Sequence, residues 1–371
     1  MKPIPFFSLE SQHEQIGRDL EKRVSAVVSG GNFILGRELE EFEKAWANYS
    51  GVPYCVGVGN GTDALTLALM AFSVGPGDEV IVPAHTFFAT WLAVKRTGAR
   101  IVPVDADEST FNISVELIPE AITPGTRVIV PVHMYGQSCD MTSIGRIARD
   151  RNLLIVEDNA QAQGAAWLEK RTGSYGHANA TSFYPTKNLG AIGDAGAVTC
   201  FDESVARRII RLRNYGMDAK NIFPECGINS RMDELQAAVL TFKLHYLDAW
   251  NTRRREIAAQ YLAALESIGD LMLPLSAKEA YHVYHIFAIR SERRDQLKDY
   301  LQKNGVSTMI HYPLPPYRQE AFRNLALDPG QFPVAERISK TVLSLPVWPG
   351  LTDDQVTHIC DLINRFFRDH L

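Results

Sequence analysis

Short apolar runs recur through the first half of the chain, and segments with helical spacing of apolar positions separate most of them. Runs of this kind, bounded by glycine, proline and polar residues, are typical of strands buried on both faces. The alternation therefore predicts an α/β domain with a mainly parallel sheet covered by helices. The predicted strands are residues 54–58, 79–83, 100–104, 127–133, 153–157, 180–184 and 196–200.

The second part of the chain has a different pattern. From residue 230 to about 265 the apolar positions keep helical spacing, which predicts a long helical region that connects two domains. The elements predicted beyond it are strands at 281–290 and 306–312, a helix with Leu297 and Leu301 on one face, and a last helix from 353 to about 368. We expect a large domain of residues 1–248, N-terminal segment included, and a small C-terminal α+β domain of residues 249–371.

Composition narrows the function without assigning it. The 371 residues are 46% hydrophobic and 22% charged, with a net charge of −5, so we expect no general attraction for nucleic acid or anionic membranes. The N-terminus lacks a signal-peptide pattern and no apolar stretch approaches 18 residues, which favours the cytoplasm. The five scattered cysteines are interpreted as free thiols, and no metal site is expected.

Lys187 is the first candidate for chemistry, because it lies in an apolar, turn-rich segment just before a glycine. An amine in such surroundings loses its proton more easily than a solvated one, and a neutral amine forms a Schiff base with an aldehyde. Taken alone, Lys187 is one of 38 Lys and Arg residues, and a loop lysine is the simpler interpretation.

Asp158 favours the Schiff-base interpretation of Lys187 over that of a loop lysine. It ends an apolar run and is expected at the carboxyl end of a buried strand, where ligands of open α/β sheets bind. A carboxylate there can hold a pyridine nitrogen protonated, which makes the ring an electron sink. The alternative is that Asp158 caps the segment 159–162 that follows, and the two roles are compatible.

A glycine-containing turn at residues 59–62 follows a predicted strand and opens a predicted helix. Glycine lets the backbone approach an anion, and the first amides of a helix attract a phosphate. The turn has neither the Walker ending nor the spacing of a dinucleotide fingerprint, so an ordinary helix start capped by Thr62 is the alternative. Ser182, five positions before Lys187, adds a hydroxyl that favours the phosphate.

The order of these pieces resembles the fold-type I pyridoxal phosphate (PLP) enzymes, and four segments look like those of the nucleotide-sugar aminotransferases of the DegT/DnrJ/EryC1/StrS type. The segments are residues 83–90, 156–161, 182–190 and 229–238. These enzymes aminate keto-sugars for antibiotics and surface polysaccharides. The resemblance runs from Pro5 almost to the C-terminus and implies a mainly parallel seven-stranded sheet in the large domain.

The resemblance also implies a role for each site residue. Lys187 is expected to form the Schiff base with the cofactor and to move the proton, and Asp158 to pair with the ring nitrogen. Phe87 is expected to stack on the cofactor ring, and Gln161 to lie near the ring hydroxyl. The residues expected to hold the cofactor phosphate are Gly61, Thr62 and Ser182. Asn229 is expected to reach the phosphate of the cofactor that is bound in the partner subunit. That contact implies a homodimer. The implied substrate residues are Tyr184, Lys220, Arg231, His311 and Tyr312, with Lys220 and Tyr312 coming from the partner.

The expected reaction is ping-pong transamination, in which an amino acid, most often glutamate in this family, donates its amine and a keto-sugar nucleotide accepts it. Four segments look most like enzymes that aminate C-3 of dTDP-3-oxo-6-deoxyhexoses: residues 213–216, 229–234, 250–255 and 311–316. The alternatives are amination at C-4, a pyridoxamine-dependent dehydratase and a non-catalytic regulator. Lys187 argues against the dehydratase, in which histidine replaces the lysine. Gln163 and Asn159 depart from the family pattern and leave the preferred sugar epimer open.

Overall fold

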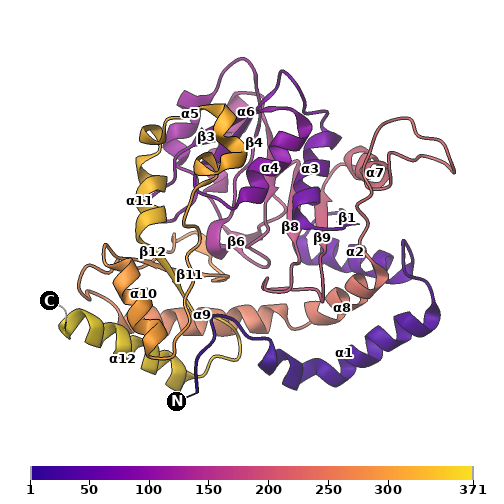
Figure 1. Cartoon of the computed structure of the whole chain (residues 1–371). Coiled ribbons are helices and arrows are strands. Elements are labelled where there is room, and N and C mark those ends of the chain that lie inside the picture. The colour runs from indigo at the N-terminus through magenta and orange to yellow at the C-terminus, as the bar shows by residue number, and fades with distance from the viewer. Residues whose placement is uncertain (1, 370–371) are drawn as a thin grey trace.

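The computed structural model describes residues 2–369, and its centre is a seven-stranded sheet (Figure 1). In spatial order the strands are β1 (Tyr54–Val58), β9 (Gly196–Cys200), β8 (Ala178–Ser182), β5 (Leu154–Asp158), β4 (Thr126–Ile129), β2 (Glu79–Pro83) and β3 (Arg100–Val104). β9 is antiparallel to both of its neighbours, and all other adjacent pairs are parallel. The predicted mainly parallel seven-stranded sheet is confirmed.

Strand β4 is shorter than expected. It ends at Ile129 and not at residue 133. Pro131 has no amide hydrogen, so the regular ladder cannot continue through it. The carbonyl of Pro131 still accepts a hydrogen bond from the amide of Asp158, which ties the end of β5 to this segment.

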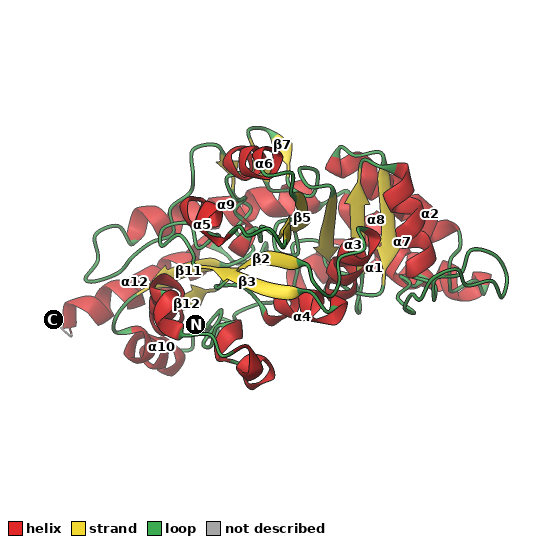
Figure 2. Cartoon of the chain, turned by 90° about the horizontal axis from the view of Figure 1, so that it is seen from above, coloured by secondary structure: helices red, strands yellow, loops and turns green. Residues whose placement is uncertain are grey.

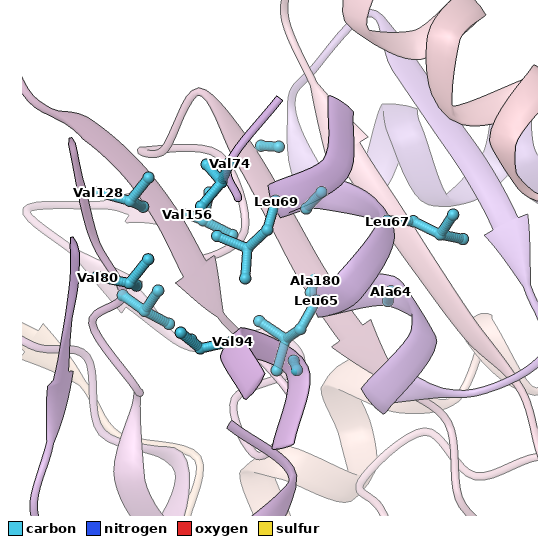
Figure 3. Packing of buried hydrophobic residues seen from close by; sticks show 14 of the residues in the cluster. Ala64, Leu65, Leu67, Leu69, Val74, Val80, Val94, Val128, Val156 and Ala180 are labelled. Atoms are coloured by element: carbon cyan, nitrogen blue, oxygen red, sulfur yellow. The ribbon is translucent and has the colours of Figure 1, made fainter. Parts of the chain in front are cut away.

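Both faces of the sheet are buried. In β2, Val80 and Val82 pack on one side against α3 (Gly61–Ala71), whereas Ile81 packs on the other side with Ile144 of α6 (Met141–Asp150). Figure 3 shows the first of these cores, with valines of β2, β4 and β5 facing leucines of α3. Continuous apolar strands thus have a partner on each face, as the pattern indicated.

The remaining helices surround this sheet and extend the molecule at one end. They are α1 (Glu10–Gly30), α2 (Arg37–Ser50), α4 (Phe88–Thr97), α5 (Ile118–Ala121), α7 (Glu203–Leu212), α8 (Glu234–Leu244), α9 (Leu247–Ala264), α10 (Arg294–Lys303), α11 (Pro333–Thr341) and α12 (Asp353–Asp369). The predicted long helical region is α8 followed by α9, with a break at residues 245–246. It leads from the sheet to α10 and α12, which lie at the end opposite α2 and α7 (Figures 1 and 2).

The C-terminal part forms its own apolar cluster around α9, α10 and α12. Its two-stranded sheet pairs β11 (Phe287–Arg290) with β12 (Val342–Leu345), a strand that the sequence pattern did not indicate. β10 (Ala280–Tyr281) pairs instead with β6 (Ala166–Trp167), which also pairs with β7 (Lys170–Arg171).

The predicted strand at residues 306–312 is wrong. This segment makes only two isolated bridges, from Val306 to Ile4 and from Met309 to Ser344 of β12. The carbonyl of His311 accepts a hydrogen bond from the hydroxyl of Tyr135, where a strand would have a ladder partner.

The domain boundary predicted at residue 248 stays a prediction. Ile4, from the N-terminal segment, packs in the apolar cluster of the C-terminal part. Within residues 2–369, no helix has the length and apolar character needed to cross a membrane.

Candidate active site

The carboxyl ends of three strands bring the predicted cofactor residues to one edge of the sheet. β1, β5 and β8 run in the same direction, because β9 is antiparallel to both β1 and β8, and β5 is parallel to β8. Asp158 ends β5, Ser182 ends β8, and Gly61 follows β1 at the start of α3. Ligands of such sheets bind at this edge.

The start of α3 lies directly against the end of β8. A Cβ added to Gly61 would lie 2.5 Å from the Cβ of Ser182, so only glycine permits this approach. The helix is capped by Asn60, whose side chain accepts a hydrogen bond from the amide of Asp63 at 2.9 Å. The alternative in which Thr62 is the cap is therefore wrong. First-turn amides beside the Ser182 hydroxyl fit a phosphate group.

The carboxylate of Asp158 is buried, with 4% of the residue exposed. One oxygen accepts a hydrogen bond from the amide of Ala160 at 3.1 Å, and the other from the hydroxyl of Thr90 at 2.8 Å. Burial raises the pKa of Asp158, while the bonds from Thr90 and Ala160 and the charge of Lys187 act to lower it. The bond to Ala160 is the local cap expected as an alternative, and it leaves lone pairs on both oxygens for a ring nitrogen.

Lys187 is half-buried, and its amide donates to the carbonyl of Tyr184 at 2.8 Å, which forms the turn that carries it. Burial lowers the pKa of Lys187 to about 8, and the charge of Asp158 opposes this shift. A fraction of the amine is therefore neutral near physiological pH, as Schiff-base chemistry requires. Lysine and acid fit the aldehyde and the ring nitrogen of PLP.

Contacts that the sequence did not reveal hold the lysine loop in place. The side-chain amide of Asn188 donates a hydrogen bond to the side-chain oxygen of Asn251 at 2.8 Å. The backbone amide of Ile192 donates to the side-chain oxygen of Gln236 at 2.9 Å. The buried ammonium of Lys243 donates to the carbonyl of Gly190. Asn251, Gln236 and Lys243 lie on α8 and α9, and helical spacing alone could not mark them as neighbours of residue 187.

Phe87, Gln161 and Tyr312 meet beside this edge. Phe87 is 53% exposed, and its ring lies 5.4 Å from the Tyr312 ring, centre to centre. The Gln161 side chain donates to the Tyr312 hydroxyl at 2.9 Å and accepts from the amide of Tyr135 at 2.8 Å. Tyr312 was expected from the partner subunit. The structure corrects this, because Tyr312 contacts Gln161 and Phe87 of its own chain.

His311 lies next to Tyr312 and is half-buried, with Nδ1 bonded to the hydroxyl of Ser344 at 2.9 Å. Burial and the charge of Lys187 lower the pKa of His311 to about 4. The imidazole is therefore neutral near pH 7. Tyr184, three positions before Lys187, is exposed, with 52% of the residue accessible to solvent.

The structure does not bring Lys220, Arg231 and Asn229 together with Lys187. Lys220 is exposed on the loop between α7 and α8, which projects from the body in Figure 1. Arg231 donates to the side chain of Asn214 at 3.0 Å, and Asn229 is exposed. The expectation that Lys220 and Asn229 act in the partner subunit stays a prediction.

The two departures from the family pattern support the end of β8. Gln163 donates to the carbonyl of Ser182 at 2.5 Å, and Asn159 donates to the hydroxyl of Thr181 at 3.4 Å. Both side chains are buried, and each has an oxygen without a hydrogen-bond partner among residues 2–369. Their effect on the sugar epimer stays a prediction.

An amine of lowered pKa that faces a buried acid is what PLP needs from a protein, so the fold and the site define a PLP enzyme of fold type I. Known proteins agree with this class. The model of the DegT/DnrJ/EryC1/StrS aminotransferase family matches residues 14–364, and the chain belongs to this family. It is an aminotransferase with PLP as its cofactor.

Two curated relatives are similar over almost the whole chain. The dTDP-3-amino-3,4,6-trideoxy-alpha-D-glucose transaminase of Streptomyces venezuelae is 43% identical over 98% of this chain and 96% of its own length. The dTDP-3-amino-3,6-dideoxy-alpha-D-galactopyranose transaminase of Aneurinibacillus thermoaerophilus is 45% identical over 98% of this chain and 99% of its own. Among solved structures, S. venezuelae DesV in complex with a ketimine intermediate superposes with a TM-score of 0.97 at 42% identity, covering 99% of each chain.

Proposed function

We propose that this enzyme transfers an amino group from an amino acid, with L-glutamate as the proposed donor, to C-3 of a dTDP-3-oxo-6-deoxyhexose. The products are a dTDP-3-amino-3,6-dideoxyhexose and a 2-oxo acid. The observation that carries the proposal is Lys187, with its lowered pKa, in a chain that is 43% and 45% identical to two dTDP-3-amino-sugar transaminases.

Each residue of the site has its own proposed role in cofactor binding or proton transfer. When bound, PLP supplies an electron sink that stabilises charge at the carbon from which a proton is removed. Lys187 is the residue placed to take up and return that proton, because its lowered pKa permits both at neutral pH. Asp158 keeps the ring nitrogen protonated, and Gly61, Thr62 and Ser182 bind the phosphate. Phe87 covers one face of the ring.

The substrate pocket is assigned to the same edge of the sheet. Tyr312 and the neutral His311 are placed to donate or accept hydrogen bonds without a change in net charge. Tyr184 adds an exposed ring for the sugar nucleotide. Lys220 and Arg231 supply positive charge for the diphosphate, with Lys220 reaching the partner's site from its projecting loop.

Amination at C-4 is the remaining alternative. The position of the diphosphate sets how far the sugar extends over Lys187, and a displacement of about 1 Å at the reacting carbon can cost ~100-fold in rate. The two curated relatives are both named for 3-amino sugars, which favours C-3.

A homodimer completes the proposal. Asn229 is exposed in the single chain, and the hydroxyl of its neighbour Ser230 accepts from the amide of Gly59 at 3.0 Å. This contact fixes the backbone of the segment that carries Asn229, and the exposed Asn229 side chain is proposed to reach the phosphate in the partner subunit. The cytoplasmic location expected from the sequence also stays a prediction.

The test is an amination assay with a panel of dTDP- and UDP-linked 3-oxo and 4-oxo sugars, each offered with a set of L-amino acids. We expect 2-oxo acid beyond one equivalent per site only with a sugar acceptor present, the highest kcat/KM for the dTDP-3-oxo-6-deoxyhexose, and no turnover with Lys187→Ala. Turnover by Lys187→Ala, or equal turnover of 3-oxo and 4-oxo sugars, would contradict the proposal.

A further inference from the structure

Two buried threonines form a chain of hydroxyl groups that ends on Asp158. The Thr86 and Thr90 hydroxyl oxygens are 2.9 Å apart, and Thr90 Oγ1 lies 2.8 Å from Asp158 Oδ2. Thr86 and Thr90 are 2% and 1% exposed, so water does not compete for these bonds. Both residues lie in the segment 83–90 of the sequence, but nothing in the pattern marked their hydroxyls as contacts of the acid.

The direction of the chain follows from the chemistry of its members. An ionised carboxylate only accepts hydrogen bonds, so Thr90 gives its single hydroxyl hydrogen to Asp158. Thr90 can then only accept from Thr86, which orients the first hydroxyl toward the second. Each bond polarises the next, and a hydroxyl bound to a charged group contributes more than a neutral pair.

The same helix start carries the ring-stacking residue. Phe87 is the N-cap residue of α4, with Thr86 before it, and the amide of Thr90 donates to the carbonyl of Phe87 at 3.2 Å. Trp91, the next residue, is fully buried and donates to the carbonyl of Pro83 at 2.9 Å, which anchors the helix to β2. One rigid segment therefore sets the position of Phe87 and the orientation of the Asp158 carboxylate.

We propose that Thr90, oriented by Thr86, is a positioning residue that holds the Asp158 carboxylate ionised and turned toward the ring nitrogen of the cofactor. This inference rests on the proposed role of Asp158. The bond from Thr90 also acts to lower the pKa of Asp158 against the effect of burial, which is the direction that an ion pair with a protonated ring requires.

The test separates the ring nitrogen from the rest of the cofactor. Apo-protein is titrated with PLP and with its 1-deaza analogue, in which a C–H group replaces the ring nitrogen, and binding is followed by tryptophan fluorescence. Thr90→Val should weaken PLP binding by about tenfold, the scale of one hydrogen bond to a charged group, and leave the analogue unchanged. Thr90→Ser keeps the hydroxyl and should restore PLP binding. Thr341→Val, a buried threonine bonded to a carbonyl within α11, is the matched control and should bind both ligands normally.

Each outcome decides the proposal. Unchanged PLP binding by Thr90→Val, an equal loss for both ligands, or no rescue by serine would overturn it. If Thr90→Val does not fold, Thr86→Val replaces it and should lose about threefold for PLP alone; an equal loss for both ligands there would overturn the proposal too. Asp158→Asn tells failure of the proposed cofactor site from failure of the threonine proposal. If Asp158→Asn binds PLP normally, the proposed cofactor site is wrong. If Asp158→Asn loses PLP affinity and the threonine variants do not, only the role of the threonines is refuted.

Discussion

The side-chain amide of Gln161 donates a hydrogen bond to the hydroxyl of Tyr312 at 2.9 Å, although the two residues are 151 positions apart in the chain. Gln161 follows the acid-bearing strand β5, and the Tyr312 ring also contacts Phe87. This contact therefore joins the cofactor site to the segment that lines the proposed sugar pocket. A change at Tyr312 is expected to affect substrate binding more than cofactor binding.

Tyr312→Phe removes that hydrogen bond and keeps the ring. One such bond contributes roughly 0.5–1.5 kcal/mol, so kcat/KM for the sugar nucleotide should fall about 3- to 10-fold, mainly through KM. Steady-state kinetics with varied sugar nucleotide measure the change. Tyr246→Phe, whose ring stacks on Trp250 outside the site, is the control, and an equal loss there would refute a specific role for the Tyr312 hydroxyl.

The lowered pKa of Lys187, about 8 against the ordinary 10.5, predicts an early onset of reactivity as pH rises. Above its pKa the amine is neutral, so acetylation of Lys187 in the apo-protein should rise between about pH 7 and 9 and then level off. Since the charge of Asp158 raises this pKa, Asp158→Asn should move the midpoint to lower pH. Competitive labelling with acetic anhydride and mass spectrometry gives both values.

Lys22 is the internal control for this experiment, because its hydrogen bond to Asp19 raises its pKa and it is well exposed. Its labelling should continue to increase above pH 10. Co-titration of Lys187 with Lys22, or an upward shift in Asp158→Asn, would show that burial does not control the lysine.

The strands of the large domain could be predicted from the sequence because they are buried on both faces. They appear as mainly apolar runs such as residues 79–83 and 196–200, in which only Glu79 and Thr199 are polar. The strands of the C-terminal part were harder to predict from the sequence. β12 follows α11 without an intervening loop, and the segment 306–312 makes its contacts with Ile4, Tyr135 and Ser344, which are remote in sequence. Alternation of polarity does not encode pairing of that kind.

The candidate site also contains residues that the sequence predicted and residues that it did not. Asp158 and Gly61 were predicted because each follows a recognisable apolar run, and Ser182 because it lies five positions before Lys187. Strand direction brings the three together. Thr90, Asn251 and Lys243 act through contacts with residues of other elements, so no local pattern marks them. The assignment of Tyr312 to the partner failed because local sequence does not show how the segment after residue 309 folds back.

Gly61→Ala tests the phosphate site. The added Cβ would lie 2.5 Å from the Cβ of Ser182, so either the start of α3 or the end of β8 must shift. We expect PLP binding by the apo-protein to weaken roughly 10-fold or more, the scale of an overpacked contact. Gly145→Ala in α6 is the matched control, because its Cβ meets nothing within 4 Å. Normal PLP binding by Gly61→Ala would exclude the helix start as the phosphate site.

Subunit mixing tests the shared site. A heterodimer of one Lys187→Ala chain and one Asn229→Ala chain carries both lesions in one site and leaves the other intact, if Asn229 acts in the partner subunit. About half of the wild-type activity per dimer should return in purified heterodimers with two different affinity tags. Activity no higher than that of the Asn229→Ala homodimer would show that each chain binds its phosphate with its own residues.

The most direct test of the account is the position of the new nitrogen in the product. The enzyme is supplied with an equimolar mixture of the 3-oxo and 4-oxo isomers of a dTDP-6-deoxyhexose together with ¹⁵N-labelled L-glutamate, and the purified sugar nucleotide is analysed by ¹H–¹⁵N and ¹H–¹³C correlation NMR. We expect ¹⁵N bonded to C-3 of the hexose in the wild-type reaction and no labelled sugar with Lys187→Ala. Nitrogen on C-4, or labelled product formed without Lys187, would contradict it.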